Sequence, residues 1–418
     1  MVLFSYYPTD PRPRRAAEAL VSFGMSVELI CVKEGSHEAK REVVNGLDVT
    51  RVPVKRYRGS IFGYICQYSS FLFICSAIIA LRSLRHRYDL IYVHNMPDFL
   101  VVSGLIPKVF GAKIILDLHD PMPELMMTIF DLPKEVKSVR LLKLLEKWSI
   151  RLADSVVTVN LACAKLFASR SCPAQKITVV MNSPDEKIFR IQSPHMHPIA
   201  QRGVKPFVIM YHGSLVERNG LDIAIEAFAR LRPLIPAAEL RIYGPRTSFL
   251  ERVMDAVRMQ GLGDTVRYLG QKSHEEIVQA IGACDVGIIP NHRNIFTELN
   301  TPSRIFEYLA VGKPVIAPRA PGICDYFDDQ SLILFELGNA EDLARKIVYS
   351  FQNPDDTREI AKRGQEVHRT HTWSNEKVLL TRLLAELLPG AGARSLPVIH
   401  STNDHQCNVQ TIERGGMG

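Results

Sequence analysis

The chain has 418 residues, of which 46% are hydrophobic and 23% charged, a composition typical of a globular protein with room for two domain cores. The net charge of +7 favours an anionic partner, but no basic run is interleaved with aromatic residues, which argues against a nucleic-acid-binding platform. The eight cysteines are scattered without metal-ligand spacing and no signal peptide is expected before the first strand, so we predict reduced thiols and a cytoplasmic protein.

The first half of the chain alternates short apolar runs with helical patterns. Strands are expected at residues 2–6, 26–32, 89–94, 113–117, 153–159 and 176–180, with a hairpin or edge strand at 45–54. Such alternation predicts a parallel sheet covered by helices, with ligand-binding groups at the carboxyl ends of its strands. We predict that residues 1–191 form this domain.

Polar residues follow several of these strands. Arg12, Arg14 and Arg15 open the helix after the first strand, where each is either a phosphate-binding group or a solvated charge. His94 and Asn95 stand at the end of the strand at 89–94.

The loop after the strand at 113–117 contains His119 and Glu124. A histidine among carboxylates at a strand tip is a candidate catalytic or sugar-binding group, the alternative being a surface histidine paired with Asp120.

The second half repeats the pattern after a predicted linker at 192–206, which is rich in Pro, His and polar residues. Strands are expected at 207–211, 239–243, 265–269, 285–290, 315–317 and 331–335. They predict a second domain at 207–370, closing helices at 371–388 and a disordered tail at 389–418.

One glycine-containing loop, residues 212–220, connects a strand to a helix. Backbone amides of such a loop can bind phosphate at the amino end of the helix. Within it Gly213, Ser214 and Arg218 are candidate contacts, and Gly244 ends the next strand in the same way.

Residues 301–318 predict a helix followed by a short buried strand. Thr301 is the expected N-cap and Pro302 the first-turn residue, and Gly312 ends the helix. On pattern alone this is one helix–strand step of any α/β domain, in which Glu307 is a solvated carboxylate paired with Arg304.

Several strings nevertheless resemble the retaining nucleotide-sugar glycosyltransferases of family 4, which have the GT-B fold and often act in bacterial surface-polysaccharide assembly. They are FEYLAVGKPVIA, VHNMPDFL, LDLHDPMPEL and YHGSLVERNGLDIAIEAF. The resemblance implies two Rossmann-like β/α/β domains facing a central cleft, with a C-terminal helix crossing back to the first domain.

The resemblance also implies roles for individual residues. Glu307 would bind the donor ribose, and Pro302 and Ser303 would stand at the helix end that faces the donor diphosphate. His119 would orient the donor sugar, with Glu124 in the same loop.

Three positions depart from the family pattern. Leu299 stands where the family often has a first glutamate, which leaves Glu298 one residue away as its candidate substitute. Ser214 and Asn219 replace an arginine and a lysine of the phosphate loop, so Arg218 becomes the candidate diphosphate cation.

We therefore expect a retaining glycosyltransferase that moves a sugar from a nucleotide-diphosphate sugar to a sugar or lipid-linked acceptor without a metal ion or other cofactor. Two alternatives remain at this point, a nucleotide-sugar epimerase and a non-catalytic homologue that is the partner of another transferase.

Residues 61–81 contain no charged residue and are long enough to cross a bilayer. Strands of one sheet are expected on both sides of this segment, so it must begin and end on the same side of a membrane. It is either a buried helix or helix pair, or a helix with an exposed apolar face. In the second case, contact through residues 55–87 would make the protein peripheral on the cytoplasmic face of the membrane.

Overall fold

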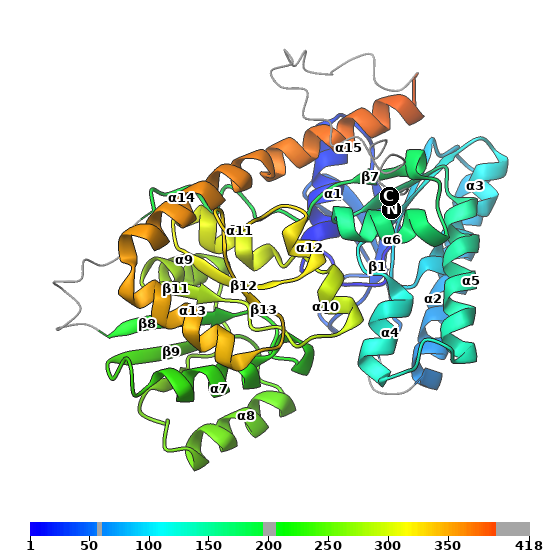
Figure 1. The fold of residues 1–418 in the computed structure, drawn as a ribbon. Coiled ribbons are helices and arrows are strands. Elements are labelled where there is room, and N and C mark those ends of the chain that lie inside the picture. The colour runs from blue at the N-terminus through cyan, green and yellow to red at the C-terminus, as the bar shows by residue number, and fades with distance from the viewer. Residues whose placement is uncertain (57–60, 195–205, 390–418) are drawn as a thin grey trace, which may run out of the picture. The chain divides into compact units, whose positions relative to one another are not determined.

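The computed structural model describes residues 1–56, 61–194 and 206–389, which form two compact units (Figure 1). Unit 1 contains residues 1–181 and the described residues from Lys377 onward, and unit 2 contains Asn182–Glu376. The predicted boundary at residue 191 differs from this division, because residues just before it bond within unit 2. Ser183 Oγ donates to His371 O (2.5 Å), and Glu186 accepts from the Ser374 amide (2.7 Å). The amide of Gln192 donates to Ala310 (2.8 Å) and its carbonyl accepts from Gln365 (2.6 Å). Most of the predicted linker, and the predicted tail from residue 390, lie outside the described residues.

Unit 1 is built on two sets of strands. They are β1 (Glu28–Val32), β2 (Arg41–Val44), β3 (Leu47–Val52), β4 (Leu90–His94), β5 (Lys113–Leu118), β6 (Ser155–Thr158) and β7 (Ile177–Val179). Their orders are β1-β3-β2 and β4-β5-β6-β7, and all pairs are parallel except the β2–β3 hairpin. The hairpin turns at Asn45 and Gly46, which both have positive φ, as a tight two-residue turn requires.

The first residues of the chain join these two sets. Val2 forms parallel bridges to Ile30 in β1 and to Val93 in β4, so the predicted first strand is present as a short paired segment. From this segment the chain first adds strands on the side of β1. It then adds strands on the opposite side, beginning with β4. In doubly wound sheets, ligands bind at the carboxyl ends of the strands at such a switch point.

The helical segments of unit 1 connect these strands. They are α1 (Pro11–Ser22), α2 (Ile61–Ser83), η1 (Asp98–Gly104), α3 (Leu105–Val109), α4 (Met122–Phe130), α5 (Lys137–Leu152), α6 (Leu161–Arg170) and η2 (Ala174–Lys176). Between β4 and β5 the 3-10 helix η1 is followed directly by α3.

Unit 2 has one fully parallel sheet of six strands in the order β10-β9-β8-β11-β12-β13. The strands are β8 (Phe207–His212), β9 (Ala238–Tyr243), β10 (Val266–Tyr268), β11 (Val286–Ile288), β12 (Val315–Arg319) and β13 (Ile333–Glu336). Numbered within the unit this is the doubly wound order 3-2-1-4-5-6, with its switch point between β8 and β11.

Helices cover this sheet and complete its core. They are η4 (Glu217–Asn219), α7 (Leu221–Leu231), α8 (Ser248–Met259), α9 (His274–Gly282), α10 (Ile295–Leu299), α11 (Ser303–Ala310), α12 (Pro321–Cys324), α13 (Ala340–Gln352) and α14 (Pro354–Thr370). Helix α15 (Trp373–Leu387) begins in unit 2 and belongs to unit 1 from Lys377 onward. Ser273 caps α9, since its hydroxyl and the Glu276 carboxylate each accept a hydrogen bond from the other residue's amide.

The predicted cap at Thr301 is wrong. Helix α11 begins at Ser303 with Pro302 as N-cap, and the Thr301 hydroxyl donates to Gly322 O (2.6 Å). The helix starts later because Thr301 anchors the preceding segment to α12.

Candidate active site

Glycines at the strand tips of the unit 2 switch point allow neighbouring backbone segments to approach each other closely. A Cβ on Gly244 would lie 2.2 Å from Gly213 O, and a Cβ on Gly220 would lie 2.1 Å from Pro290 O. Gly220 also has φ +69°, which favours glycine. The ends of β8, β9 and β11 thus come together at this edge.

Arg304, on the first turn of α11, supports the same loop. Its Nη1 donates to His212 O (2.7 Å), and its guanidinium lies over the Tyr211 ring, 5.0 Å from the centroid. A Cβ on Gly213 would lie 3.0 Å from the Arg304 side chain. Arg304 thus bonds the backbone at the start of the 212–220 loop, in place of the pair with Glu307 that was the alternative on pattern alone, and this role of Arg304 was not predicted.

Glu307 lies in the middle of α11 (Ser303–Ala310), near His212 at the end of β8. Its carboxylate accepts from Ser303 Oγ (3.2 Å) and lies 3.5 Å from His212 Nε2, with 17% of the side chain exposed. Burial, reinforced by Arg304, lowers the pKa of His212 to about 3, so this imidazole is neutral at physiological pH. The Glu307 charge is thus accessible from one side and held by neutral partners on the other.

The phosphate-loop departures have a structural counterpart. Asn219 Nδ2 donates to Ser214 O (2.8 Å), so the two residues without charge stabilise the loop itself. The half-buried Arg218 places its guanidinium over the Phe296 ring at 5.7 Å.

Glu298 lies on the short helix α10. Its carboxylate is 3.9 Å from Arg293, and 40% of the side chain is exposed. The predicted substitution of Glu298 for the family glutamate stays a prediction.

Asp117 is the centre of the strand-tip network in unit 1. Arg12 donates to both of its carboxylate oxygens (2.7–3.1 Å) and to Val180 O (2.9 Å), and Tyr92 donates from its hydroxyl (3.2 Å). Burial would raise the pKa of Asp117, but Arg12 and His94 lower it below its usual range. This buried guanidinium ties α1 to β5 and to the residue that follows β7, and the phosphate-binding role of Arg12 stays a prediction.

His94 is also part of this network. Its Nδ1 lies 3.2 Å from Asp117 Oδ2, and both side chains are 1% exposed. Burial lowers the pKa of His94 despite the neighbouring carboxylate. His94 is accordingly a neutral structural group and not an acceptor contact.

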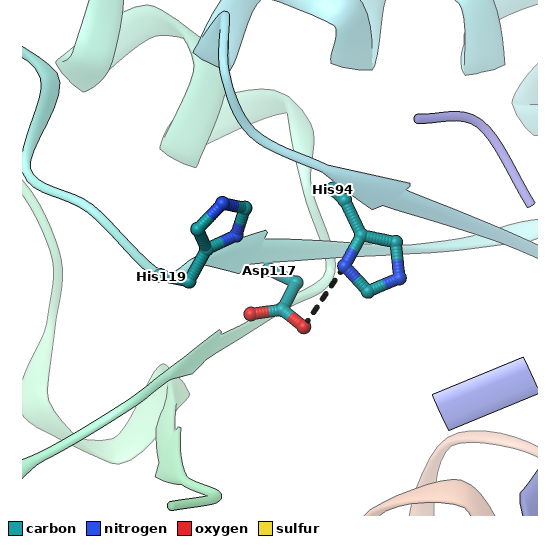
Figure 2. Close-up of side chains that lie close together, drawn as sticks. All are labelled: His94, Asp117 and His119. Carbon is teal, nitrogen blue, oxygen red and sulfur yellow. Dashed lines mark ion pairs between the residues drawn. The ribbon is translucent and has the colours of Figure 1, made fainter. Parts of the chain in front are cut away.

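Asp117 lies between His94 and His119 in Figure 2, and ligand atoms of the three residues are within 4.8 Å of one another. This spacing alone would suit a metal ion. Both Asp117 oxygens already accept from Arg12, whose positive charge would oppose a cation there. The three residues therefore do not fit a metal centre.

Asn95 positions the loop that carries His119. Its Nδ2 donates to Asp98 (3.0 Å) and to Asp120 O (2.6 Å), while its Oδ1 accepts from the His119 amide (3.1 Å). Asn95 is 4% exposed, so it supports the site and does not contact a ligand. Burial, with the nearby Glu146 charge, raises the pKa of Asp98 to about 7.

His119 lies at the same tip, beside Asp117. Its ring is half-buried, and its Nδ1 is a buried atom without a hydrogen-bond partner among the described residues. An imidazole nitrogen can bond a sugar hydroxyl.

The other predicted contacts of unit 1 are engaged internally. Glu124 is 2% exposed and accepts from Arg170 (2.5 and 2.9 Å), which also bonds Glu146. Arg15 donates to Pro11 O in its own helix (3.1 Å), and Arg14 lies 4.0 Å from Glu18. Glu124 and Arg15 thus have internal partners, and their proposed ligand contacts stay predictions.

Each unit matches a family of known proteins. Residues 10–183 match the family described as "Glycosyl transferase 4-like domain", and residues 193–367 match "Glycosyl transferases group 1".

Curated relatives are distant but extensive. The chain is 23% identical over 368 residues to the 2-deoxystreptamine glucosyltransferase of Streptomyces kanamyceticus, covering 84% of this chain and 92% of that protein. It is 27% identical to the putative colanic acid biosynthesis glycosyltransferase WcaL of Escherichia coli, over 57% of each chain.

Solved structures share the fold along most of the chain. A sucrose-phosphate synthase from Thermosynechococcus elongatus matches with a TM-score of 0.71 and 19% identity over 93% of this chain and 98% of that one. Anabaena Alr3699/HepE in complex with UDP matches with a TM-score of 0.69 and 16% identity over 92% and 99%. These neighbours confirm the predicted GT-B fold.

Proposed function

Because residues 10–183 and 193–367 match glycosyltransferase families and the chain has the GT-B fold, we propose that it transfers a sugar, with retention of configuration, from a nucleotide-diphosphate sugar to an acceptor in surface-polysaccharide assembly. Relatives named for colanic acid and amylovoran biosynthesis support this role. Alr3699/HepE, which shares the fold, was solved with UDP and with UDP-glucose, which supports a nucleotide-sugar donor.

The observation that carries this proposal is the arrangement at the switch point of unit 2. Gly213 and Gly244 keep the strand tips free of side chains, and Glu307 presents a half-buried carboxylate beside them on α11. A carboxylate can accept hydrogen bonds from both vicinal hydroxyls of a ribose. Backbone amides near the amino end of a helix stabilise a phosphate group.

The leaving diphosphate must be stabilised as its bond to the sugar breaks. Arg218 and Arg304 lie on the two segments that carry the proposed donor contacts. The hydrogen bond to His212 O uses one N–H group of Arg304, and a guanidinium has five N–H groups that can donate. We assign charge compensation to these two arginines together with helix amino ends, without a metal ion.

In unit 1, His119 binds the donor sugar and orients its anomeric carbon toward the acceptor hydroxyl. The new glycosidic bond forms on the face from which the diphosphate leaves, and a departing phosphate oxygen takes the hydroxyl proton. Asn95 and the Asp117 network act on His119 only by holding its loop.

The test is incubation with a panel of nucleotide sugars, with and without a lipid extract as acceptor source, while nucleoside diphosphate release is measured. Release that requires one donor and the extract supports the proposal. Conversion of the donor to an isomeric nucleotide sugar without acceptor would identify an epimerase. The absence of both nucleoside diphosphate release and isomerisation with every donor would indicate a non-catalytic partner protein.

A further inference from the structure

Helix α2 has one buried face and one exposed apolar face. Tyr68, Phe71, Cys75 and Ile79 recur at helical spacing and are at most 6% exposed. On the opposite side lie the exposed residues Phe62, Ile65, Phe73, Leu81 and, just beyond the helix, Leu84. The stretch Phe62–Ser83 has a mean hydropathy of 1.7, yet only 28% of its most apolar window is buried. Both sequence alternatives thus apply to one helix, which packs on one side and exposes the other.

The exposed apolar surface continues onto neighbouring segments. The segment η1 packs against both α2 and α5, and α3 also contacts α2. Exposed apolar side chains on η1, α3 and the following residue are Val102, Leu105, Ile106, Val109 and Phe110. We call the surface of α2, η1, α3 and α5 the α2–α5 face.

Helix α5 adds large apolar side chains and positive charge. Leu141, Leu144 and Trp148 lie one or two turns apart and are 52–65% exposed. The exposed cations of the same helix are Lys137, Arg140, Lys147 and Arg151. Its one acidic residue, Glu146, is buried against Arg170, so the exposed side of α5 is apolar and cationic.

A groove with both properties lies at the end of α2. It encloses about 380 Å³ and is lined by Ile78, Leu81, Leu84, Arg41, Arg82 and Arg85. Apolar and guanidinium groups side by side suit an amphiphile whose headgroup is negatively charged. Two flanking arginines do not take the role expected from the sequence, because Arg82 pairs with Glu28 (2.7 Å) and Arg56 lies over the Phe4 and Tyr6 rings.

We propose that the α2–α5 face docks on an anionic lipid bilayer, with its apolar side chains below the headgroups and its lysines and arginines among them. Such a surface contact combines buried apolar area with attraction to anionic lipid. A single crossing by α2 is excluded, because β3 and β4, on either side of it, belong to the sheet that Val2 joins. Two copies meeting through this face would bring basic α5 helices together, which argues against self-association.

Flotation of the full chain with vesicles tests the contact without any donor or acceptor, so its outcome is independent of the proposed reaction. Vesicles of phosphatidylcholine with phosphatidylglycerol are compared with pure phosphatidylcholine at low and high salt. We expect flotation with the anionic vesicles at low salt and its loss at high salt.

Two face variants and one matched control separate the contributions. Phe62→Asp with Phe73→Asp removes apolar contact, and Lys137→Glu with Arg140→Glu and Lys147→Glu reverses charge. Each should lower vesicle partitioning roughly tenfold or more. Leu234→Asp with Met259→Asp changes equally exposed apolar residues of unit 2 (66% and 82%) and should leave partitioning unchanged.

A spectroscopic readout needs no change to the face. The chain has two tryptophans, so Trp373→Phe leaves Trp148 as the sole reporter. Its emission should shift to the blue with anionic vesicles and be quenched by brominated lipid. Flotation without these changes would show that another surface binds, and the absence of flotation would overturn the proposal. A dimer in light scattering that Phe62→Asp with Phe73→Asp dissociates would assign the face to self-association instead.

Discussion

Replacing Glu307 by glutamine should weaken nucleotide binding while leaving the fold intact. The substitution keeps the size and helix propensity of the side chain, and its oxygen can still accept from Ser303 Oγ. It removes the negative charge that we assign to the ribose hydroxyls. The expected change therefore isolates the charge from the packing.

The magnitude follows from the environment of the carboxylate. Its side chain is 17% exposed, so water screens a bound hydroxyl little. Hydrogen bonds to a charged group contribute about 1.5–3 kcal/mol each. Loss of one such contribution corresponds to roughly a 10- to 150-fold increase in Kd.

Calorimetric titration with UDP, GDP and ADP identifies the bound nucleotide, and the variants are then titrated with it. Glu226→Gln is the matched control, since Glu226 is an exposed carboxylate of the same unit paired with Arg230. Equal Kd values for the wild type and Glu307→Gln, with unchanged thermal unfolding, would refute the assignment of Glu307 to the donor.

Three further outcomes are expected. His119→Ala should lower kcat at least tenfold with an unchanged Kd for the bare nucleoside diphosphate, and wild-type turnover would make His119 structural. EDTA should leave turnover unchanged, whereas full inactivation that Mg²⁺ or Mn²⁺ reverses would contradict a metal-independent reaction. Asp98 has a pKa of about 7 in the folded protein, against 3.8 in the unfolded chain. Unfolding therefore releases a proton between about pH 4 and 7, so the free energy of unfolding falls over this range and stays at the lower value above pH 7. Asp98→Asn should therefore raise the free energy of unfolding at pH 8, by up to about 4 kcal/mol, and change it little at pH 4, as urea titrations can measure; an equal effect at both pH values would contradict this.

Local patterns predicted the elements well because each depends on residues close in sequence. Apolar runs of four to six residues indicated the parallel strands. The hairpin or edge strand expected at 45–54 contains β3, but it began at the turn residue Asn45 and left out β2. The order of these elements was sufficient for the GT-B fold, which the structural neighbours confirm.

The site was harder to predict because its polar residues bond to partners far away in sequence. Arg12 meets Asp117, 105 residues later, and Arg170 meets Glu124, 46 residues earlier. A strand-tip arginine or glutamate looks the same in sequence whether it binds a ligand or another side chain. Arg304 shows the converse, since a local pair with Glu307 was the simplest expectation and its partner is the carbonyl of His212, 92 residues away.

The two units use equivalent positions in opposite ways. Each has a buried histidine of lowered pKa at the end of a switch-point strand, His94 on β4 and His212 on β8. In unit 1 the adjacent carboxylate, Asp117, is enclosed by Arg12, so the charges at this tip neutralise each other and remain inaccessible. In unit 2 the adjacent carboxylate, Glu307, accepts from the Ser303 hydroxyl and lies 3.5 Å from the neutral imidazole of His212, with 17% of its side chain exposed. The partly exposed carboxylate is therefore in unit 2, whereas the carboxylate at the unit 1 tip is buried and the loop of His119 is held by Asn95. This asymmetry supports assigning the nucleotide to unit 2 and sugar positioning to His119.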